Sequence, residues 1–360
     1  MRAFATTSPL QHVARWALAA LLLGVSGAAL AQACSMPLPG EGSDDAPFEI
    51  GDVTAFTSMT DRFAELTNAL SFTDACWSAS FVLTDDVDLK GVDFVPVGRD
   101  GNRSRVNRAT FNGTFDGGGH AIHHLRMDGD GIDSGKDRSG MALFQELAGA
   151  TVRDVTFASP FARSPGYDVA VLAGAAADAT IRDVTISGAD VRGGAVVGVV
   201  AGRVTGGTWT NVSVLGSNVR VNDNMYTNRW RGGGLAGLLL LTSDLVVRDP
   251  DVDVSVDGLF QTGGAFGNVV AKDDTSSLIV TGGQVTTVVH GESETGGLVG
   301  TVKPDTTVAI EGTRFDVEVR PSPRLPGNAT ITHGGGIVGN VQGGALRIDE
   351  STVVADADLG

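Results

Sequence analysis

A short apolar segment that ends in glycine or, in one copy, in a polar residue recurs along the chain and restricts its fold more than any other feature. The last residues of successive copies lie 28 to 39 positions apart. The copies are ALFQ (142–145), VLAG (171–174), VVAG (199–202), GLAG (234–237), GAFG (264–267), GLVG (297–300) and GIVG (336–339). A second apolar stretch follows each copy, and in 151–157 and 180–186 its apolar residues stand near alternate positions. This period of two predicts strands.

A repeat of about 30 residues made of short strands and turns cannot enclose its own core, so each copy must bury side chains against its neighbours. Copies that follow one another in the same orientation superimpose most simply in parallel, with coils about 4.8 Å apart. The interior would be built from small side chains, because hydrophobic residues make up 42% of the chain and aromatic ones 6%. We therefore expect an all-β chain that folds as a right-handed parallel β-helix.

Residues 1–33 have the features of a secretory signal peptide. Two arginines precede or border an apolar run, Trp16–Leu30, and Ala31-Gln32-Ala33 offers a peptidase site. We expect a mature chain from Cys34 onward, without a membrane span, that is secreted, periplasmic or at the cell surface. A retained membrane anchor and a lipid attached to Cys34 are the alternatives. The lipid is disfavoured because Ala31 stands where lipoproteins usually have leucine.

The chain has two cysteines, Cys34 and Cys76. In an exported chain an even count predicts a disulfide. That bond would tie the mature N-terminus to the first folded segment. Two unrelated thiols are the alternative.

Residues 34–80 form an N-terminal segment with one predicted helix, Ser58–Leu70, ahead of a β-helix over 81–360. The helix would cover the open end of the first coil, whose unpaired strand edges otherwise favour association. The sequence shows no such cap after the last coil. We expect either that charged residues protect the strand edge of this coil or that the edge associates with a partner, such as a second copy of the chain. The helix is predicted from its apolar face and from a capping side chain, which are Met59, Phe63, Leu66 and Leu70, and Ser58 or Thr60.

Two stretches resemble a known family. The GLVG segments followed by a strand such as ATIRDV (179–184), and above all FNGTFDGGGHAI (111–122), are similar to GLUG-motif repeat proteins. These are bacterial surface and secreted chains of the pectate-lyase-like β-helix class, and the resemblance covers residues 48 to the end. It implies the β-helix and a surface or secreted scaffold for adhesion or glycan binding. Some members are parts of a zinc protease of immunoglobulins, but this chain has no H-E-x-x-H motif.

The longest polar insertion in the middle of the chain, 222–231, is the first place to look for a binding face. Aromatic rings stack on sugars, and arginine side chains lie beside them here. The candidate ligand-binding residues are Trp209, Tyr226, Arg229, Trp230 and Arg231. An irregular surface loop without a ligand is the alternative.

The formal net charge of −16 argues against nucleic acid and anionic membranes as partners, and it is compatible with divalent cations. Asp128, Asp130 and Asp133 lie in a short Gly-rich loop that could bind calcium weakly. The loop lacks the EF-hand pattern, so a plain acidic loop is the alternative. No other cofactor is indicated. Of the three histidines His120, His123 and His124, the first and last share a strand face and could bind a metal, or His120 is simply part of the repeat.

No catalytic residues can be identified from linear spacing, and we expect a noncatalytic scaffold. The alternative is a polysaccharide-processing enzyme, a lyase or hydrolase. It would need two carboxylates, or a carboxylate and an arginine, near Trp230. The Arg153-Asp154 and Arg182-Asp183 pairs stand at equivalent places in adjacent copies, and we expect them to stack as a surface ladder of charges.

Overall fold

The computed structural model describes residues 33–99, 109–129, 140–221, 230–273, 275–324 and 331–357. The contacts divide the chain into two units, Met1–Ala33 and Cys34–Gly360, and the second unit contains every helix and strand described below. The signal-peptide prediction falls almost wholly outside the described residues and stays a prediction. Within the described residues, no helix is both long and apolar enough to cross a membrane.

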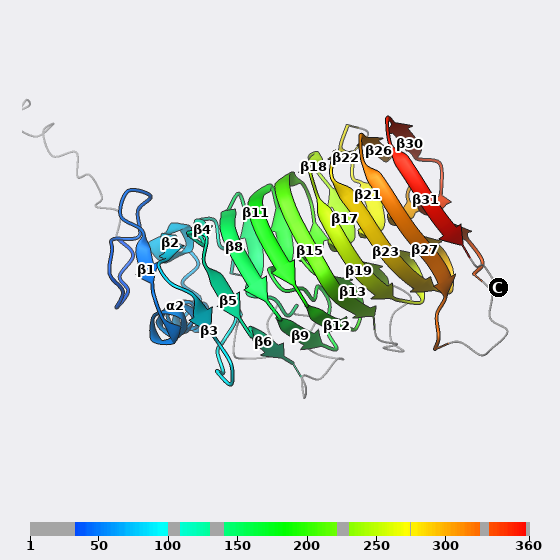
Figure 1. Ribbon diagram of the computed structural model, residues 1–360. Coiled ribbons are helices and arrows are strands. Elements are labelled where there is room, and N and C mark those ends of the chain that lie inside the picture. The colour runs from blue at the N-terminus through cyan, green and yellow to red at the C-terminus, as the bar shows by residue number, and fades with distance from the viewer. Residues whose placement is uncertain are drawn as a thin grey trace, which may run out of the picture. The chain divides into compact units, whose positions relative to one another are not determined.

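The strands of the second unit form three parallel sheets, and each new coil pairs its strands with those of the coil before it (Figure 1). This confirms the β-helix predicted from the repeats. Sheet B consists of β7 (Phe144–Ala148), β10 (Ala173–Ala177), β14 (Ala201–Val204), β17 (Ala236–Leu241), β21 (Phe266–Ala271), β25 (Val299–Val302) and β29 (Val338–Val341). Sheet C consists of β13 (Val196–Gly198), β16 (Arg231–Gly233), β20 (Phe260–Gly263), β24 (Ser293–Gly296) and β28 (Gly334–Gly335).

Sheet A is the largest sheet and contains 19 described strands. From β8 onward most coils contribute to it twice, before and after a bend. Its strands are β1 (Phe48–Ile50), β2 (Ser80–Leu83), β3 (Val87–Asp88), β4 (Thr114–Asp116), β5 (Ala121–His123), β6 (Arg126–Asp128), β8 (Thr151–Ala158), β9 (Phe161–Ser164), β11 (Ala179–Ser187), β12 (Asp190–Gly193), β15 (Gly207–Val221), β18 (Leu245–Arg248), β19 (Asp251–Asp257), β22 (Ser277–Thr281), β23 (Gln284–Gly291), β26 (Thr307–Glu311), β27 (Arg314–Pro321), β30 (Ala345–Asp349) and β31 (Thr352–Ala357).

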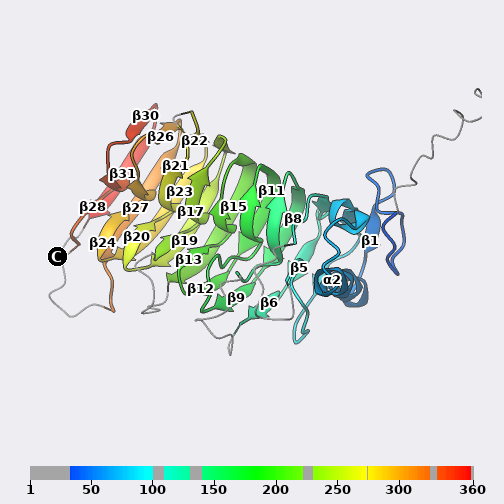
Figure 2. The ribbon, with the colours of Figure 1, turned by 180° about the vertical axis from the view of Figure 1, so that it is seen from behind.

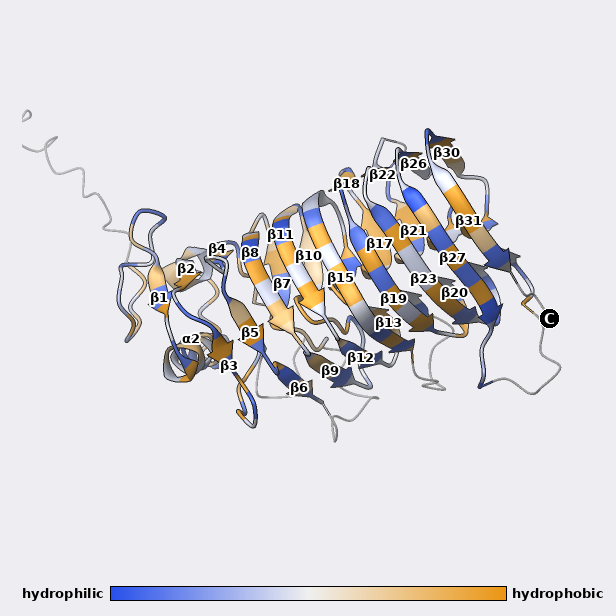
Figure 3. Ribbon diagram, viewed as in Figure 1, coloured by the Kyte–Doolittle hydropathy of each residue, from blue (hydrophilic) through white to orange (hydrophobic). Residues whose placement is uncertain are grey.

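Apolar side chains of equivalent positions stack from coil to coil in the interior. Ile181 pairs with Val152, and Ile186 pairs with Phe157, and all four side chains are buried. Apolar and polar bands alternate along the strands of sheet A (Figure 3). Each buried Val, Leu, Ile or Phe stabilises the fold by about 1.5–3 kcal/mol. The interior therefore depends on register between neighbouring copies, as the repeat spacing predicts.

The bend in sheet A requires a left-handed backbone in each coil. Asp154, Asp183, Asn211 and Asp249, which we call the bend column, have φ between 50° and 54°. Aspartate and asparagine enter this region more readily than most residues. The backbone of the bend therefore accounts for the Asp of the Arg-Asp pairs.

A helix packs against the first coil at the N-terminal end. It is α2 (Val53–Asn68), and the side chain of Asp52 caps it by accepting a hydrogen bond from the Ala55 amide at 2.7 Å. Phe63 lies on its buried face, with its ring centroid 4.8 Å from that of Trp77. The predicted start at Ser58 is therefore wrong, because Asp52 begins the helix six residues earlier. Leu70 lies beyond the helix and is exposed, rather than on its buried face.

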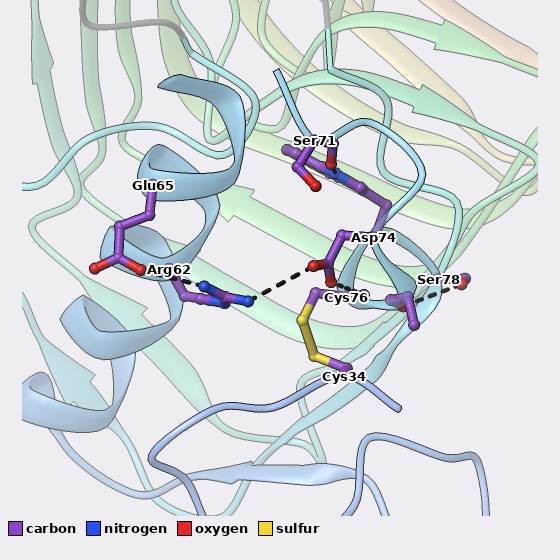
Figure 4. The surroundings of a disulfide bond; sticks show 9 residues. Cys34, Arg62, Glu65, Ser71, Asp74, Cys76 and Ser78 are labelled. Carbon is purple, nitrogen blue, oxygen red and sulfur yellow. Dashed lines mark hydrogen bonds and ion pairs between the residues drawn. A yellow bond between two sulfur atoms is a disulfide. The ribbon is translucent and has the colours of Figure 1, made fainter. Parts of the chain in front are cut away.

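Cys34 and Cys76 form a disulfide beside α2, which confirms the predicted pair (Figure 4). Cys76 belongs to a short 3-10 helix, η1 (Ala75–Ser78), that follows α2. The neighbouring Arg62 of α2 lies 3.6 Å from the carboxylate of Asp74 and 3.3 Å from that of Glu65. A disulfide of this kind is typical of an oxidising compartment, so the chain is an extracytoplasmic protein.

The last described coil leaves apolar side chains exposed. Leu346 and Ile348 of β30 are in register with the buried Val308 and Ile310 of the preceding coil. Both are exposed, and so is Val353 of β31. Self-association through this coil stays a prediction.

Candidate ligand-binding site

Trp209 is not a surface residue. Its side chain is fully buried in β15, in register with Ile181 and, through it, with Val152. The prediction that Trp209 stacks on a ligand is therefore wrong, because the inward position of the repeat places the indole in the core. Aligning the copies would have revealed this. Tyr226 and Arg229 lie outside the described residues, so their role stays a prediction.

Trp230 and Arg231 do lie together, on the outside of sheet C. The half-buried Trp230 precedes β16, and its ring centroid is 5.3 Å from that of Phe260 in the next coil. Phe260 is 37% exposed. Arg231 donates a hydrogen bond from Nε to Oε1 of Gln261 at 2.9 Å. We call Trp230 and Phe260 the aromatic pair.

A network of polar side chains continues from Arg231 toward the C-terminal coils. It joins sheet C to sheet B where β20, β24 and β28 follow one another (Figure 2). Gln261 accepts a second hydrogen bond from Nδ2 of Asn268 at 2.8 Å and donates from Nε2 to Glu294 at 2.8 Å. We call this network the corner strip; its members are Arg231, Gln261, Asn268, Glu294, Thr301, Asn340 and Gln342.

The carboxylate of Glu294 is the centre of the corner strip. Its Oε2 accepts hydrogen bonds from Thr301 at 2.6 Å and from Gln261 at 2.8 Å. Its Oε1 accepts from Asn340 at 3.2 Å and from Gln342 at 2.8 Å. An ionised carboxylate has about four acceptor positions, so these four bonds use its capacity.

The surroundings of Glu294 favour its ionised form. Burial raises the pKa of this carboxyl, but hydrogen bonds from Thr301 and Gln261 and the positive charge of Lys303 lower the pKa more, so that it lies below its usual value. Lys303 itself donates to Oε1 of Gln342 at 2.8 Å. At neutral pH Glu294 is a fixed anion with compensated charge.

Two residues of the corner strip have an uncommon backbone conformation. Gln261 has a φ of 46° and Glu294 a φ of 53°. Both occupy one position of successive coils, together with Arg231 before them, and we call these three residues the corner column. Long side chains rarely occupy the left-handed region, and such strain is often found at functional sites.

The sequence contained a signal for this network that the motif search missed. A polar residue stands three positions before the last of the glycines of sheet C in four successive copies: RGGG (231–234), QTGG (261–264), ETGG (294–297) and HGGG (333–336). Only the stacking of coils makes these residues neighbours. The partners from sheet B, such as Asn268 and Thr301, follow seven positions later in the chain.

The Arg-Asp pairs form the expected charged ladder on sheet A. Arg153 lies 2.6 Å from the carboxylate of Asp116, and Arg182 lies 3.2 Å from that of Asp183 and 3.6 Å from that of Asp154. Three of these carboxylates line a shallow open pocket of about 530 Å³. We call these five residues the charged ladder. Each ion pair is partly exposed and contributes about 0–1 kcal/mol.

The acidic and histidine motifs remain separate from the corner strip. Asp128 of β6 accepts from Arg126 at 2.6 Å, while Asp130 and Asp133 lie outside the described residues, so calcium binding stays a prediction. His124 lies 2.8 Å from Asp88, and this hydrogen bond lowers the pKa of the Asp88 carboxyl. No group of three or more potential metal ligands is found in the described part of the chain.

Comparison with known proteins gives the fold but no family. No family model matches the chain. Over 225 residues, 60% of this chain, it is 28% identical to halomucin of Haloquadratum walsbyi, and the match spans 2% of that protein. A crystal structure of a putative immunoglobulin A1 protease from Bacteroides ovatus superposes with a TM-score of 0.53 at 14% identity, covering 87% of this chain and 90% of that chain. The chain is therefore a parallel β-helix protein with a distant sequence relative in halomucin.

Proposed function

We propose that this chain is an exported, noncatalytic β-helical scaffold that binds glycans through the aromatic pair and the corner strip. The observation that carries the proposal is their juxtaposition. The aromatic pair, in which Trp230 is half-buried and Phe260 is exposed, lies directly beside an ordered set of amide, hydroxyl and guanidinium groups. A sugar presents apolar C–H faces and hydroxyl edges, which such a surface recognises by stacking and hydrogen bonding.

The state of Glu294 supports binding rather than catalysis. A general acid that cleaves a glycosidic bond needs a raised pKa, whereas the pKa of Glu294 is lowered. A nucleophile or base needs an available oxygen, whereas both oxygens of Glu294 accept two hydrogen bonds each. Glu294 therefore orders its neighbours and is poorly suited to attack a substrate.

We further propose that the chain is a GLUG-like repeat protein that acts in adhesion. It would be secreted, periplasmic or held at the cell surface. The glycine-flanked repeats support the first part. The disulfide supports a place outside the cytoplasm. Fractionation of the producing cells, with the protein followed by antibody, distinguishes the three locations.

The experiment is a binding screen against a panel of neutral and acidic polysaccharides by affinity electrophoresis. We expect at least one polysaccharide to retard the protein, and Trp230→Ala and Phe260→Ala to abolish the retardation. Phe161→Ala is the matched control, because Phe161 is a half-buried aromatic residue on the outside of sheet A. Retardation that persists in both aromatic-pair variants contradicts this site.

The charged ladder favours a second candidate, a polysaccharide-processing enzyme. It places carboxylates and arginines on adjacent coils, as such chemistry requires. Incubation with neutral and acidic polysaccharides, followed by measurement of product chain length, tests it. Scaffold function predicts unchanged lengths. Shortening that is lost in Asp154→Asn would establish the enzyme instead.

A further inference from the structure

We propose that the ligand of the corner strip is a linear, uncharged polysaccharide that lies along the axis of the β-helix, with one sugar unit for each of four coils. This inference rests on the proposed glycan-binding function and adds the ligand's direction, length and charge. It follows from three features of the described residues: a continuous column of stacking and hydroxyl groups, the compensation of charge, and an unsatisfied buried amide.

The first feature is a column that runs through four coils without interruption. Trp230 stacks on Phe260 at 5.3 Å between ring centroids, and Phe260 is in register with Ser293. Thr332 of the next coil donates to the hydroxyl of Ser293 at 2.8 Å. Coils lie about 4.8 Å apart, which is close to the length of one extended β-linked pyranose unit.

The corner column runs beside this first column with the same period. Arg231 contacts Gln261 of the next coil, and Gln261 contacts Glu294 of the coil after that. The exposed His333 follows in the fourth coil. A polymer that lies along the axis therefore meets a stacking or hydroxyl group on one side and a polar side chain on the other at every coil.

The second feature is the balance of charge around Glu294, which leaves the centre of the corner strip without a net attraction for polyanions. Glu294 accepts four hydrogen bonds and lies in the field of Lys303, and Lys303 is bonded to Gln342. The rest of the chain is strongly acidic, with a formal net charge of −16. Hydroxyl groups suit such a surface better than carboxylate or sulfate groups, which the chain as a whole repels.

The third feature is Asn268 of β21, which is fully buried in sheet B and contacts Gln261 of sheet C. Its Nδ2 donates to Gln261, but its Oδ1 has no hydrogen-bond partner in the described part of the chain. Buried polar atoms in native proteins nearly always have a partner. A water molecule held beneath the ligand and bonded to one of its hydroxyl groups would supply the missing donor.

Titration calorimetry with linear β-1,4-linked cello-, manno-, xylo- and chito-oligosaccharides of two to eight units tests the proposal. For the series that binds, we expect the dissociation constant to fall by at least about tenfold from two to four units and then to level off. Raising the salt concentration from about 50 to 500 mM should change that constant less than about twofold. A plateau at two units overturns the axial arrangement, and binding only to charged polymers overturns the uncharged ligand.

Variants at the two ends of the strip give a sharper test. Trp230→Ala should weaken all lengths, whereas Thr332→Ala and His333→Ala should weaken tetramers and leave dimers unchanged. Gln284→Ala is the matched control, because Gln284 is an exposed amide on sheet A one coil earlier. Equal effects of the Thr332 and His333 variants on dimers and tetramers contradict the proposal. If no oligosaccharide or polysaccharide binds at all, the proposed function itself fails.

Discussion

The bend column of sheet A and the corner column of sheet C meet the same backbone demand with different residues. Both contain left-handed positions, repeated from coil to coil. The bend column uses Asp and Asn, and the next two coils use Gly282 and Gly312 there, all of which enter this region readily. Glu350 occupies the same position in the last described coil and is the exception. The corner column places Gln261 and Glu294 in the left-handed region. Backbone preference therefore explains most of the first column but not the second.

The difference shows what the corner column gains from its long side chains. Gln261 reaches both the neighbouring coil and sheet B, as its bonds to Glu294 and Asn268 show. Each net hydrogen bond contributes about 0.5–1.5 kcal/mol, and bonds to a charged group about 1.5–3 kcal/mol. The network thus offsets a backbone strain of about 1–3 kcal/mol per residue.

The largest expected difference between the columns comes from replacing each acid by glycine. Glycine relieves the left-handed backbone at both places. In Glu294→Gly four donors lose their acceptor, and we expect the free energy of unfolding to fall by about 2–3 kcal/mol. Asp183→Gly loses only exposed contacts and should stay within about 1 kcal/mol of the parent. Urea denaturation followed by circular dichroism measures both, and equal effects would refute the distinction.

A smaller effect is expected from shortening Gln261 by one methylene group. Gln261→Asn suits the left-handed backbone better but cannot reach Arg231, Asn268 and Glu294 together. We expect a loss of about 1–2 kcal/mol in the free energy of unfolding. Asp249→Asn in the bend column is the control and should change it by less than about 0.5 kcal/mol. A stabilised Gln261→Asn protein would mean that strain outweighs the network.

The lowered pKa of Glu294 predicts that the free energy of unfolding depends on pH, by an amount no larger than the effect of Gln261→Asn. Its ionised form is favoured by folding, so the stabilisation is present at neutral pH and disappears as the pH falls below the usual glutamate value of about 4.3. Glu294→Gln should therefore lower stability at pH 7 by about 1 kcal/mol and converge with the parent under acid conditions. Thermal unfolding from pH 7 to pH 3 measures this. A constant gap across that range would contradict the prediction.

The smallest effect is expected in the charged ladder next to the bend column. Arg182→Ala removes contacts with Asp154 and Asp183, all partly exposed. We expect a loss of about 0.5 kcal/mol or less, which vanishes in about 0.5 M salt. Denaturation at low and high salt measures it. A loss above about 1 kcal/mol would show that the ladder matters to the fold as much as the corner strip.

The fold could be predicted because the interior repeats in the sequence itself. Once the copies are stacked, Ile181 must lie over Val152, and the glycines mark the turns. The same register places Trp209 inside, whereas its aromatic character taken alone favours a ligand-binding role at the surface. Helix α2 began earlier than predicted because Asp52 lies outside the apolar pattern that was used to find it.

The candidate site could be predicted only in part because its contacts join different sheets. Trp230 and Arg231 stood out as an aromatic residue and a cation in a polar insertion. Asn268 and Glu294 did not, since neither forms a motif with its neighbours in the chain. Their proximity depends on the angle between sheets B and C and on the distance between coils, and neither quantity is written in a linear spacing.

The two ends of the β-helix differ in how they resist opening. At the N-terminal end α2 and the Cys34–Cys76 bond hold the first coil, whereas β30 and β31 expose their apolar side chains to water. In a structure where each coil contacts only its neighbours, unfolding begins at the end whose terminal coil is held by fewer interactions. In the 360-residue chain, mechanical pulling or protease attack should therefore separate β30 and β31 from the preceding coil before it opens the first coil. A polymer bound across the outermost coils would hold them together and slow their separation under mechanical force.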